Sequence, residues 1–155
     1  MKIKLASSLA SPRQKDLRKG RHSQPNYVYH ITTTTLNRQP VFKDFNDARA
    51  LIKHLKISDD LGHTSTLAFV VMPDHLHWLF QLNQHKNLSK VMQSLKTLSA
   101  KTIGKAIWQA GYYDHAVRKD EDIQAIARYI VANPMRAGLV KRVGDYPHWD
   151  AVWVL

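Results

Sequence analysis

Segments with two different patterns of hydrophobic residues alternate along the chain. Segments rich in β-branched and aromatic residues favour strands, and segments whose apolar residues recur every three to four positions favour amphipathic helices. The predicted strands cover residues 27–35, 65–71, 75–82 and 112–118. The predicted helices cover residues 45–57, 88–108 and 120–133. Asp44 stands where it can cap the first helix, and Pro134 restricts the residue at the end of the last one.

The order of these elements, β-α-β-β-α-β-α, predicts an α+β fold. We expect a ferredoxin-like antiparallel sheet with helices packed on one face. The short Met72-Pro73-Asp74 connection indicates a hairpin between the second and third strands. A chain of 155 residues with 44% hydrophobic composition can build one ordinary core. We therefore expect a single domain over 27–155, preceded by a flexible basic arm over 1–26.

The charge balance narrows the class of partner. The chain has 23 Lys and Arg against 12 Asp and Glu, a net charge of +11, which indicates a polyanion such as nucleic acid. A single lysine is as a rule only a solvated surface charge, but the stretch between His75 and Tyr113 contains lysines and no carboxylate. The candidate phosphate contacts in the arm and in this stretch are Arg13, Arg18, Lys19, Arg21, Lys90, Lys101 and Lys105.

Other features of the composition exclude several classes. There is no cysteine, so disulfides and thiolate metal sites are excluded, and any metal must be bound through nitrogen and oxygen. A short apolar patch near the start is interrupted by Pro12, Arg13 and Lys15, so we do not expect secretion. No run of about 18 apolar residues is present, and we expect a cytoplasmic protein without a membrane partner.

The His75-Leu76-His77 run lies in a predicted strand. Because side chains alternate across a strand, the two histidines share one face, about 7 Å apart along the backbone, while Leu76 and Trp78 face the core. Two imidazoles at this spacing can converge on one cation. The chain has nine histidines, however, so such a pair also arises by chance among ordinary sheet residues. The spacing alone leaves both interpretations open.

Tyr129 lies on the last predicted helix, four residues before Asn133, so both side chains share one helical face. Another face carries the apolar stripe, which consists of Ile123, Ile126, Ala127 and Ile130. The core therefore does not need Tyr129. Its phenol is available for chemistry, although a tyrosine covering the rim of the helix would fit the pattern equally well.

Two runs together resemble a known family. They are VVMPDHLHWLF at residues 70–80 and IWQAGYYDHAVRKDEDIQAIARYIVANPMRAGLV at residues 107–140. Both resemble the HUH single-tyrosine transposases, and most of all the REP-associated tyrosine transposases of bacteria. The resemblance extends from about Tyr27 to Trp149.

The resemblance implies specific roles for four residues. His75 and His77 would bind a divalent ion, Mg²⁺ or Mn²⁺, and Tyr129 would attack the scissile phosphate of single-stranded DNA. Asn133 would stand at the place of a polar third ligand. Insertion-sequence relatives typically have glutamine there, one methylene longer, so direct coordination and coordination through a water both stay open.

The implied activity is that of a metal-dependent single-strand DNA endonuclease and strand transferase. It would act on hairpin or REP-type DNA through a 5′-phosphotyrosine intermediate, in the bacterial cytoplasm at the nucleoid, as a monomer rather than a dimer. Tyr112 and Tyr113 can stack on unpaired bases, and packing in the core is an equally good interpretation of both. His115 and Arg118 would contact DNA or shape the site, and a structural, hydrogen-bonded role for His115 is the alternative.

Two other functions compete with this one. A non-catalytic module that binds single-stranded nucleic acid, such as a domesticated transposase, would explain the charge. RNA-recognition domains, however, expose aromatic residues on their central strands, where this chain has histidines. A histidine-metal hydrolase of small phosphoesters is the third possibility, and it explains neither the charge of +11 nor Tyr129.

Overall fold

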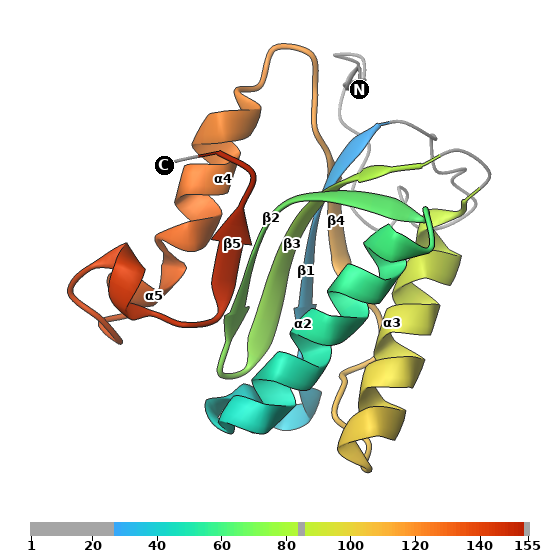
Figure 1. Cartoon of the computed structure of the whole chain (residues 1–155), viewed down its shortest axis with the longest axis vertical. Helices are drawn as coiled ribbons and strands as arrows, with labels where there is room; N and C mark the ends of the chain where they lie inside the picture. The colour runs from blue at the N-terminus through green and yellow to red at the C-terminus, as the bar shows by residue number, and fades with distance from the viewer. Residues whose placement is uncertain (1–26, 84–85, 154–155) are drawn as a thin grey trace.

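The computed structural model describes residues 27–83 and 86–153 (Figure 1). Its centre is a five-stranded antiparallel sheet in the order β4-β1-β3-β2-β5. The strands are β1 (Val28–Thr34), β2 (Thr64–Met72), β3 (His75–Leu82), β4 (Tyr113–Ala116) and β5 (Trp149–Ala151). The α-helices are α2 (Phe45–Asp60), α3 (Leu88–Ile103), α4 (Ile123–Val131) and the single-turn α5 (Asn133–Arg136), and 3-10 turns cover Leu36–Arg38, Val41–Lys43 and Val143–Asp145.

The predicted α+β class, the antiparallel sheet and the order of the first seven elements are confirmed. β2 and β3 form the expected hairpin, with Met72 opposite His75 across the tight connection. β3 is the central strand and pairs with β1 on its other side. The short β5 was not predicted, because three residues are too few to establish a period in the sequence.

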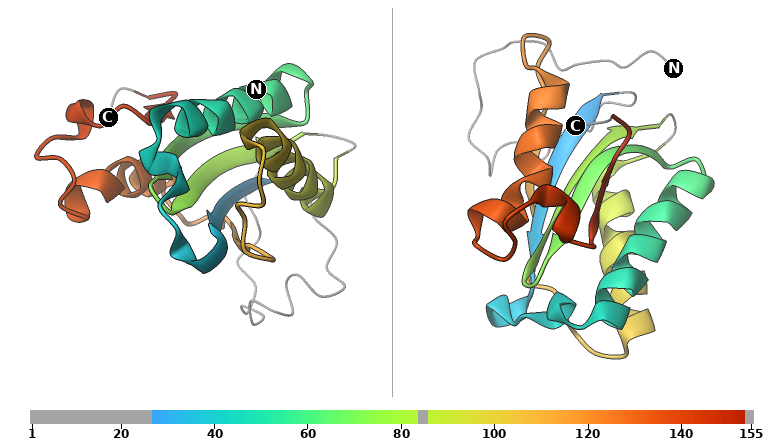
Figure 2. Two further views of the ribbon diagram at one scale, coloured as in Figure 1. Left: turned by 90° about the horizontal axis from the view of Figure 1, so that it is seen from below. Right: turned by 60° about the vertical axis from the view of Figure 1, so that its left-hand side comes forward.

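Helices cover both faces of the sheet, whereas the sequence predicted helices on one face. Figure 2 shows α2 and α3 on one side and α4 with α5 on the other. The reason lies in β2, which is buried at every position from Leu67 to Met72. A strand that is apolar on both faces needs a cover on both faces.

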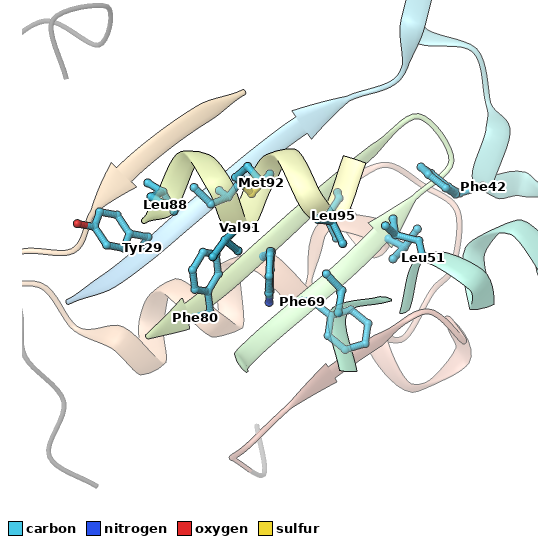
Figure 3. Close-up of a cluster of buried hydrophobic side chains, with 14 of the residues drawn as sticks. Tyr29, Phe42, Leu51, Phe69, Phe80, Leu88, Val91, Met92 and Leu95 are labelled. Atoms are coloured by element: carbon cyan, nitrogen blue, oxygen red, sulfur yellow. The ribbon is translucent and has the colours of Figure 1, made fainter. Parts of the chain in front are cut away.

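The larger core lies between the sheet and the pair α2 and α3 (Figure 3). Trp78 and Phe80 of β3 are fully buried there against Met92 and Leu95 of α3. Burial of each such side chain contributes about 1.5–3 kcal/mol. The expected inward orientation of Leu76, Trp78 and Phe80 is therefore confirmed, and it fixes His75 and His77 on the opposite face.

A second core holds α4 against that opposite face. Ala127 and Ile130 of α4 are buried with Val70 and Leu79 of the sheet. Ile123 and Ile126 pack at its margin, so the predicted apolar stripe of the helix is confirmed. This packing turns the outer surface of α4, with Tyr129, toward solvent.

Two helix boundaries differ from the prediction. α3 ends at Ile103 and not near Trp108, because Gly104 adopts a left-handed φ of 92° that ends the helix. α4 starts at Ile123 and not at Asp120, because the side chain of Asp122 accepts a hydrogen bond from the Ala125 backbone N–H and caps the helix. The expected cap of the first helix by Asp44 is confirmed.

The basic arm over 1–26 lies outside the described residues, and with it Arg13, Arg18, Lys19 and Arg21. The arm and the domain limits stay predictions. Within 27–83 and 86–153, no helix is both long and apolar enough to cross a membrane.

Candidate catalytic site

The site lies on the face of the sheet that carries α4. His75 and His77 of β3 point to this face, and their ring centroids are 4.9 Å apart. β1 contributes His30 and Thr32, because Thr32 lies directly opposite His77 in the antiparallel register. The strand pairing thus brings side chains separated by more than 40 residues in the sequence into one polar cluster.

His77 is fixed by two partners on β1. Its Nδ1 lies 3.0 Å from Nε2 of His30 and 3.1 Å from the Thr32 hydroxyl. Burial, together with the nearby charges of His30, His75 and Arg136, lowers the pKa of His77 to about 3. His77 is therefore a neutral imidazole at physiological pH, which is the form that binds metals.

His75 is oriented by a carboxylate. Its Nδ1 lies 2.8 Å from Oδ1 of Asp74, the residue before it, and the other carboxylate oxygen of Asp74 lies 3.1 Å from Nε of Arg38. Asp74 thus holds the ring in one orientation and is itself held by an arginine.

These contacts fit a divalent ion. In both His75 and His77 the Nδ1 atom is engaged in a hydrogen bond, which leaves Nε2 free for a ligand, as is usual for metal-binding histidines. Within the described segments, no set of three or more His, Cys, Asp or Glu side chains is arranged to hold a metal. An ion here would need oxygen ligands from an amide, water or phosphate, and nitrogen with oxygen donors suits Mn²⁺.

Asn133, the predicted third ligand, is the first residue of α5 and is partly buried. Its backbone carbonyl accepts from the Ala137 N–H, which starts the short helix. No hydrogen bond of its side chain occurs within the described part of the chain, so the amide is available to a ligand. Its role in coordination stays a prediction.

Tyr129 lies on the same side of the molecule. Its side chain is exposed (59%), and the guanidinium of Arg136 stacks 3.8 Å from the centre of its ring. The charge of Arg136 is also one of those that lower the pKa of His77. One arginine therefore acts on both the predicted nucleophile and a predicted metal ligand.

An open hollow of about 410 Å³ extends this site toward β4. It is lined by His30, His115, Glu121 and Tyr129, among others. His115 lies opposite His30 in the register, and its Nε2 is 2.9 Å from Oε1 of Glu121. Burial first, and then the neighbouring charge of His115, lower the pKa of His30 to about 4. His115 is thus a partly buried, hydrogen-bonded residue at the margin of the site.

The remaining predicted DNA contacts do not gather on one surface. Lys90 and Lys101 are exposed on α3, which covers the other face of the sheet, and Lys105 follows that helix. Tyr112 packs at the margin of the larger core. Tyr113 is 55% exposed and lies opposite Thr32, on the histidine side. The backbone N–H of Arg118 donates to Glu121, and no side-chain role emerges for this arginine.

Sequence reasoning missed His30, Thr32 and Arg136. The signal for the first two was present, because Val28, His30, Thr32 and Thr34 occupy alternate positions of a predicted strand. Only the register against β3 tells which histidine they meet. Arg136 could not be found in this way, because its position depends on the turn between α4 and α5.

A sheet whose central strand presents a His-x-His pair on the side of an exposed helix tyrosine is the arrangement of an HUH-type transposase domain. In agreement, residues 23–133 match the family model described as "Transposase IS200 like". The chain belongs to this family.

Two curated relatives agree with this family assignment. The chain is 34% identical over 82 residues to the REP-associated tyrosine transposase of Escherichia coli, an alignment that covers 52% of this chain and 50% of that protein. It is 30% identical over 99 residues to a Haemophilus influenzae protein provisionally given the same name, covering 54% and 56%. The chain thus spans about half the length of the curated relatives that it matches. The resemblance predicted from the sequence is confirmed.

Two solved structures share the fold. One is a REP-associated tyrosine transposase bound to a REP hairpin, with a TM-score of 0.70 and 26% identity, covering 91% of this chain and 82% of that one. The other is a Deinococcus radiodurans protein described as a transposase, with a TM-score of 0.52 and 23% identity, covering 66% and 87%. The second likeness supports the fold alone.

Proposed function

We propose that this protein is a metal-dependent single-strand DNA endonuclease and strand transferase that acts on hairpin DNA of the REP type. The observation that carries the proposal is the pair of oriented imidazoles of His75 and His77 on the same side as Tyr129, with Arg136 acting on both His77 and Tyr129. The solved REP-associated relative is bound to a REP hairpin, which supports the choice of substrate. The charge of +11 supports a polyanionic ligand.

In this proposal His75 and His77 hold Mg²⁺ or Mn²⁺ through Nε2, with Asn133 as a third, direct or water-mediated, ligand. The ion supplies charge neutralisation at the phosphoryl oxygens of the scissile phosphate. Asp74, His30 and Thr32 keep the two imidazoles in place. Arg136 restricts the ring of Tyr129, so that its hydroxyl can approach the phosphorus in line.

The chemistry is a transesterification. The Tyr129 oxygen forms a bond to phosphorus, the bond from phosphorus to the 3′-oxygen breaks, and the phenol proton is passed to solvent as the leaving 3′-oxygen takes up a proton. The product is a 5′-phosphotyrosine and a free 3′-hydroxyl. Attack by another 3′-hydroxyl reverses these changes and releases Tyr129, so strands are joined without an external energy source.

The test is incubation of an end-labelled single-stranded hairpin DNA with the wild-type protein, with Tyr129→Phe and with Tyr113→Phe, each with Mn²⁺ or with chelator. A covalent protein–DNA band is expected from the wild type and from Tyr113→Phe in Mn²⁺ only. An equal band from Tyr129→Phe would refute the assigned nucleophile. Binding of the hairpin without any covalent product would support the non-catalytic module instead.

Two further assignments belong to this proposal. His75→Ala is expected to lose cleavage while it still binds the hairpin, because phosphate contacts elsewhere supply most of the affinity. The active species is expected to be a monomer. Light scattering of the eluting protein with and without hairpin tests this, and a stable dimer would contradict it.

A further inference from the structure

A second hollow, of about 250 Å³, lies beside the histidines at the edge of the sheet. Thr32 and Thr34 of β1 form one wall, and residues 109–113 form the other. Thr32 joins this hollow to the candidate metal site, because its hydroxyl also lies 3.1 Å from Nδ1 of His77. A ligand in the hollow would therefore be next to a phosphate held at the histidines.

The loop that forms the outer wall is held in place by Lys96 of α3. The ammonium of Lys96 donates to the carbonyl of Gln109 at 2.7 Å and to that of Gly111 at 2.6 Å. The backbone N–H of Gln109 donates to the carbonyl of Thr34 at 3.0 Å, which ties the loop to β1. Gly111 has a φ of 78°, a conformation that favours glycine. The wall is thus built by specific contacts.

Lys96 is engaged in this wall and does not project into solvent. It is partly buried, and burial lowers the pKa of its ammonium. The sequence suggests that a lysine of the carboxylate-free stretch contacts phosphates. Here the two short hydrogen bonds give Lys96 a positioning function for the loop instead.

The lining indicates which chemical group would bind. It consists of hydroxyls, an amide, backbone groups and two tyrosines, and none of its residues carries a charged side chain. A phosphate would find no cation among them. A flat, neutral group with hydrogen-bond donors and acceptors fits this set, and the exposed ring of Tyr113, directly opposite Thr32, offers a stacking surface.

We propose that this hollow binds one unpaired nucleobase of the DNA strand, adjacent to the phosphate at His75 and His77. Tyr113 stacks on the base, and Lys96 positions the loop that encloses it. This inference rests on the proposed function and names a base-binding subsite of the same site. It would restrict cleavage to strands with an unpaired, accessible base at that position.

The test is a double-mutant cycle between protein and DNA, measured by fluorescence anisotropy with Mn²⁺ in the non-cleaving Tyr129→Phe background. The probe is a hairpin with single-stranded flanks, in which an abasic site replaces each flank nucleotide in turn. One abasic position is expected to weaken binding about tenfold when Tyr113 is present. With Tyr113→Ala the intact DNA should bind as weakly, and the abasic site should cost nothing further. Tyr113→Phe should behave as the parent.

Equal abasic penalties with and without Tyr113→Ala, at every flank position, would overturn the proposal. Phe45→Ala is the matched control, since Phe45 is an exposed aromatic residue (59%) on α2. It should leave every penalty unchanged.

Lys96 is tested separately. Lys96→Met should reduce the coupling between Tyr113 and the abasic position, and Lys96→Arg, which retains donors, should preserve it. Neither should change the dependence of affinity on salt. A loss of about 0.7 in the slope of log K against log salt for Lys96→Met would mark a phosphate contact and overturn its positioning role. Lys53→Met, at an exposed position on α2, is the control.

Failure of this proposal can be distinguished from failure of the proposed function. If the protein forms the covalent product through Tyr129 but the cycle is additive, only the base subsite is refuted. If the wild type does not bind the hairpin at all, both proposals fall.

Discussion

Nε2 of His30 lies 3.0 Å from Nδ1 of His77, so that two partly buried imidazoles from neighbouring strands share a hydrogen bond. The low pKa values of both, about 4 and about 3, mean that neither is protonated at neutral pH. With the proposed ion on Nε2 of His77, the Nδ1–H of His77 would donate to His30 or to Thr32. The proposal therefore gives His30 a supporting role at the metal site and not that of a ligand.

Replacement of His30 should weaken metal binding. His30→Ala removes a hydrogen-bond partner of His77, a proposed metal ligand, and losses of this kind typically cost about 10- to 100-fold in metal affinity. Titration calorimetry with Mn²⁺, without DNA, measures the effect. His30→Gln, which can still accept from Nδ1–H, should retain more affinity.

The control for His30 is His54→Ala, since His54 bonds Thr102 between α2 and α3, far from the site in the fold. If both alanine variants bind Mn²⁺ as the wild type does, Thr32 alone orients His77 and the role given to His30 is wrong.

The metal-free protein should lose stability in mild acid. Burial lowers the pKa of His30 to about 4 and that of His77 to about 3, so below the unfolded value of 6.5 the unfolded chain binds more protons than the folded one. Stability is then fully present above 6.5 and is lost as the pH falls toward 4. Each group contributes at most about 1.4 kcal/mol per pH unit.

Urea unfolding in chelator at several pH values between 7 and 4.5 measures this loss. The double variant His30→Gln, His77→Gln should show a shallower dependence on pH than the wild type. An identical dependence would mean that these two histidines do not carry the effect.

Arg136 should assist cleavage without assisting metal binding. Its guanidinium stacks on the Tyr129 ring, a contact worth about 0.5–1 kcal/mol at an exposed site. Arg136→Gln should therefore slow single-turnover cleavage at saturating Mn²⁺ by about two- to fivefold, whereas Mn²⁺ affinity should not fall, because the variant removes a positive charge that acts on His77. Arg142→Gln, which removes an exposed arginine paired with Asp145, should cleave at the wild-type rate. Equal rates for the two variants would show that Arg136 does not orient the nucleophile.

Two neighbouring residues of α4 should have different functions, one in the chemistry and one in the stability of the fold. Tyr129→Phe removes an exposed hydroxyl and should change the free energy of unfolding by less than about 0.5 kcal/mol. Ile130→Ala, at the next residue, shortens a fully buried side chain and should lower the free energy of unfolding by about 2–5 kcal/mol. Urea unfolding of both variants measures this. A large loss for Tyr129→Phe would assign the phenol a structural role.

Much of the fold was predictable because local pattern and tertiary environment agree. The alternation of apolar and polar residues in β3 predicts Trp78 in the core and His77 on the opposite face, and both side chains lie there in the structure. The end of α3 was missed because Gly104 ends a helix whose apolar pattern continues beyond it. The position of α4 on the second face of the sheet follows from the burial of β2 on both faces. A short apolar run in the sequence does not distinguish such a strand from one that is buried on one face only.

The candidate site was predictable only in part. His75, His77 and Tyr129 lie in recognisable motifs, whereas His30 contacts a residue 47 positions away and Lys96 contacts residues 13 and 15 positions away. Such contacts depend on strand register and loop path, and sequence spacing does not encode them directly. The contact between Glu121 and His115, six residues earlier, likewise depends on the path of the chain between β4 and α4.

The most direct test of the central claim is identification of the residue that carries the DNA. After reaction with hairpin DNA in Mn²⁺, nuclease treatment and trypsin digestion, mass spectrometry should find the phosphonucleotide adduct on residues 129–136, a peptide with Tyr129 as its one tyrosine. An adduct on residues 106–118, which contain Tyr112 and Tyr113, would contradict the account, as would a reaction that leaves every tyrosine unmodified.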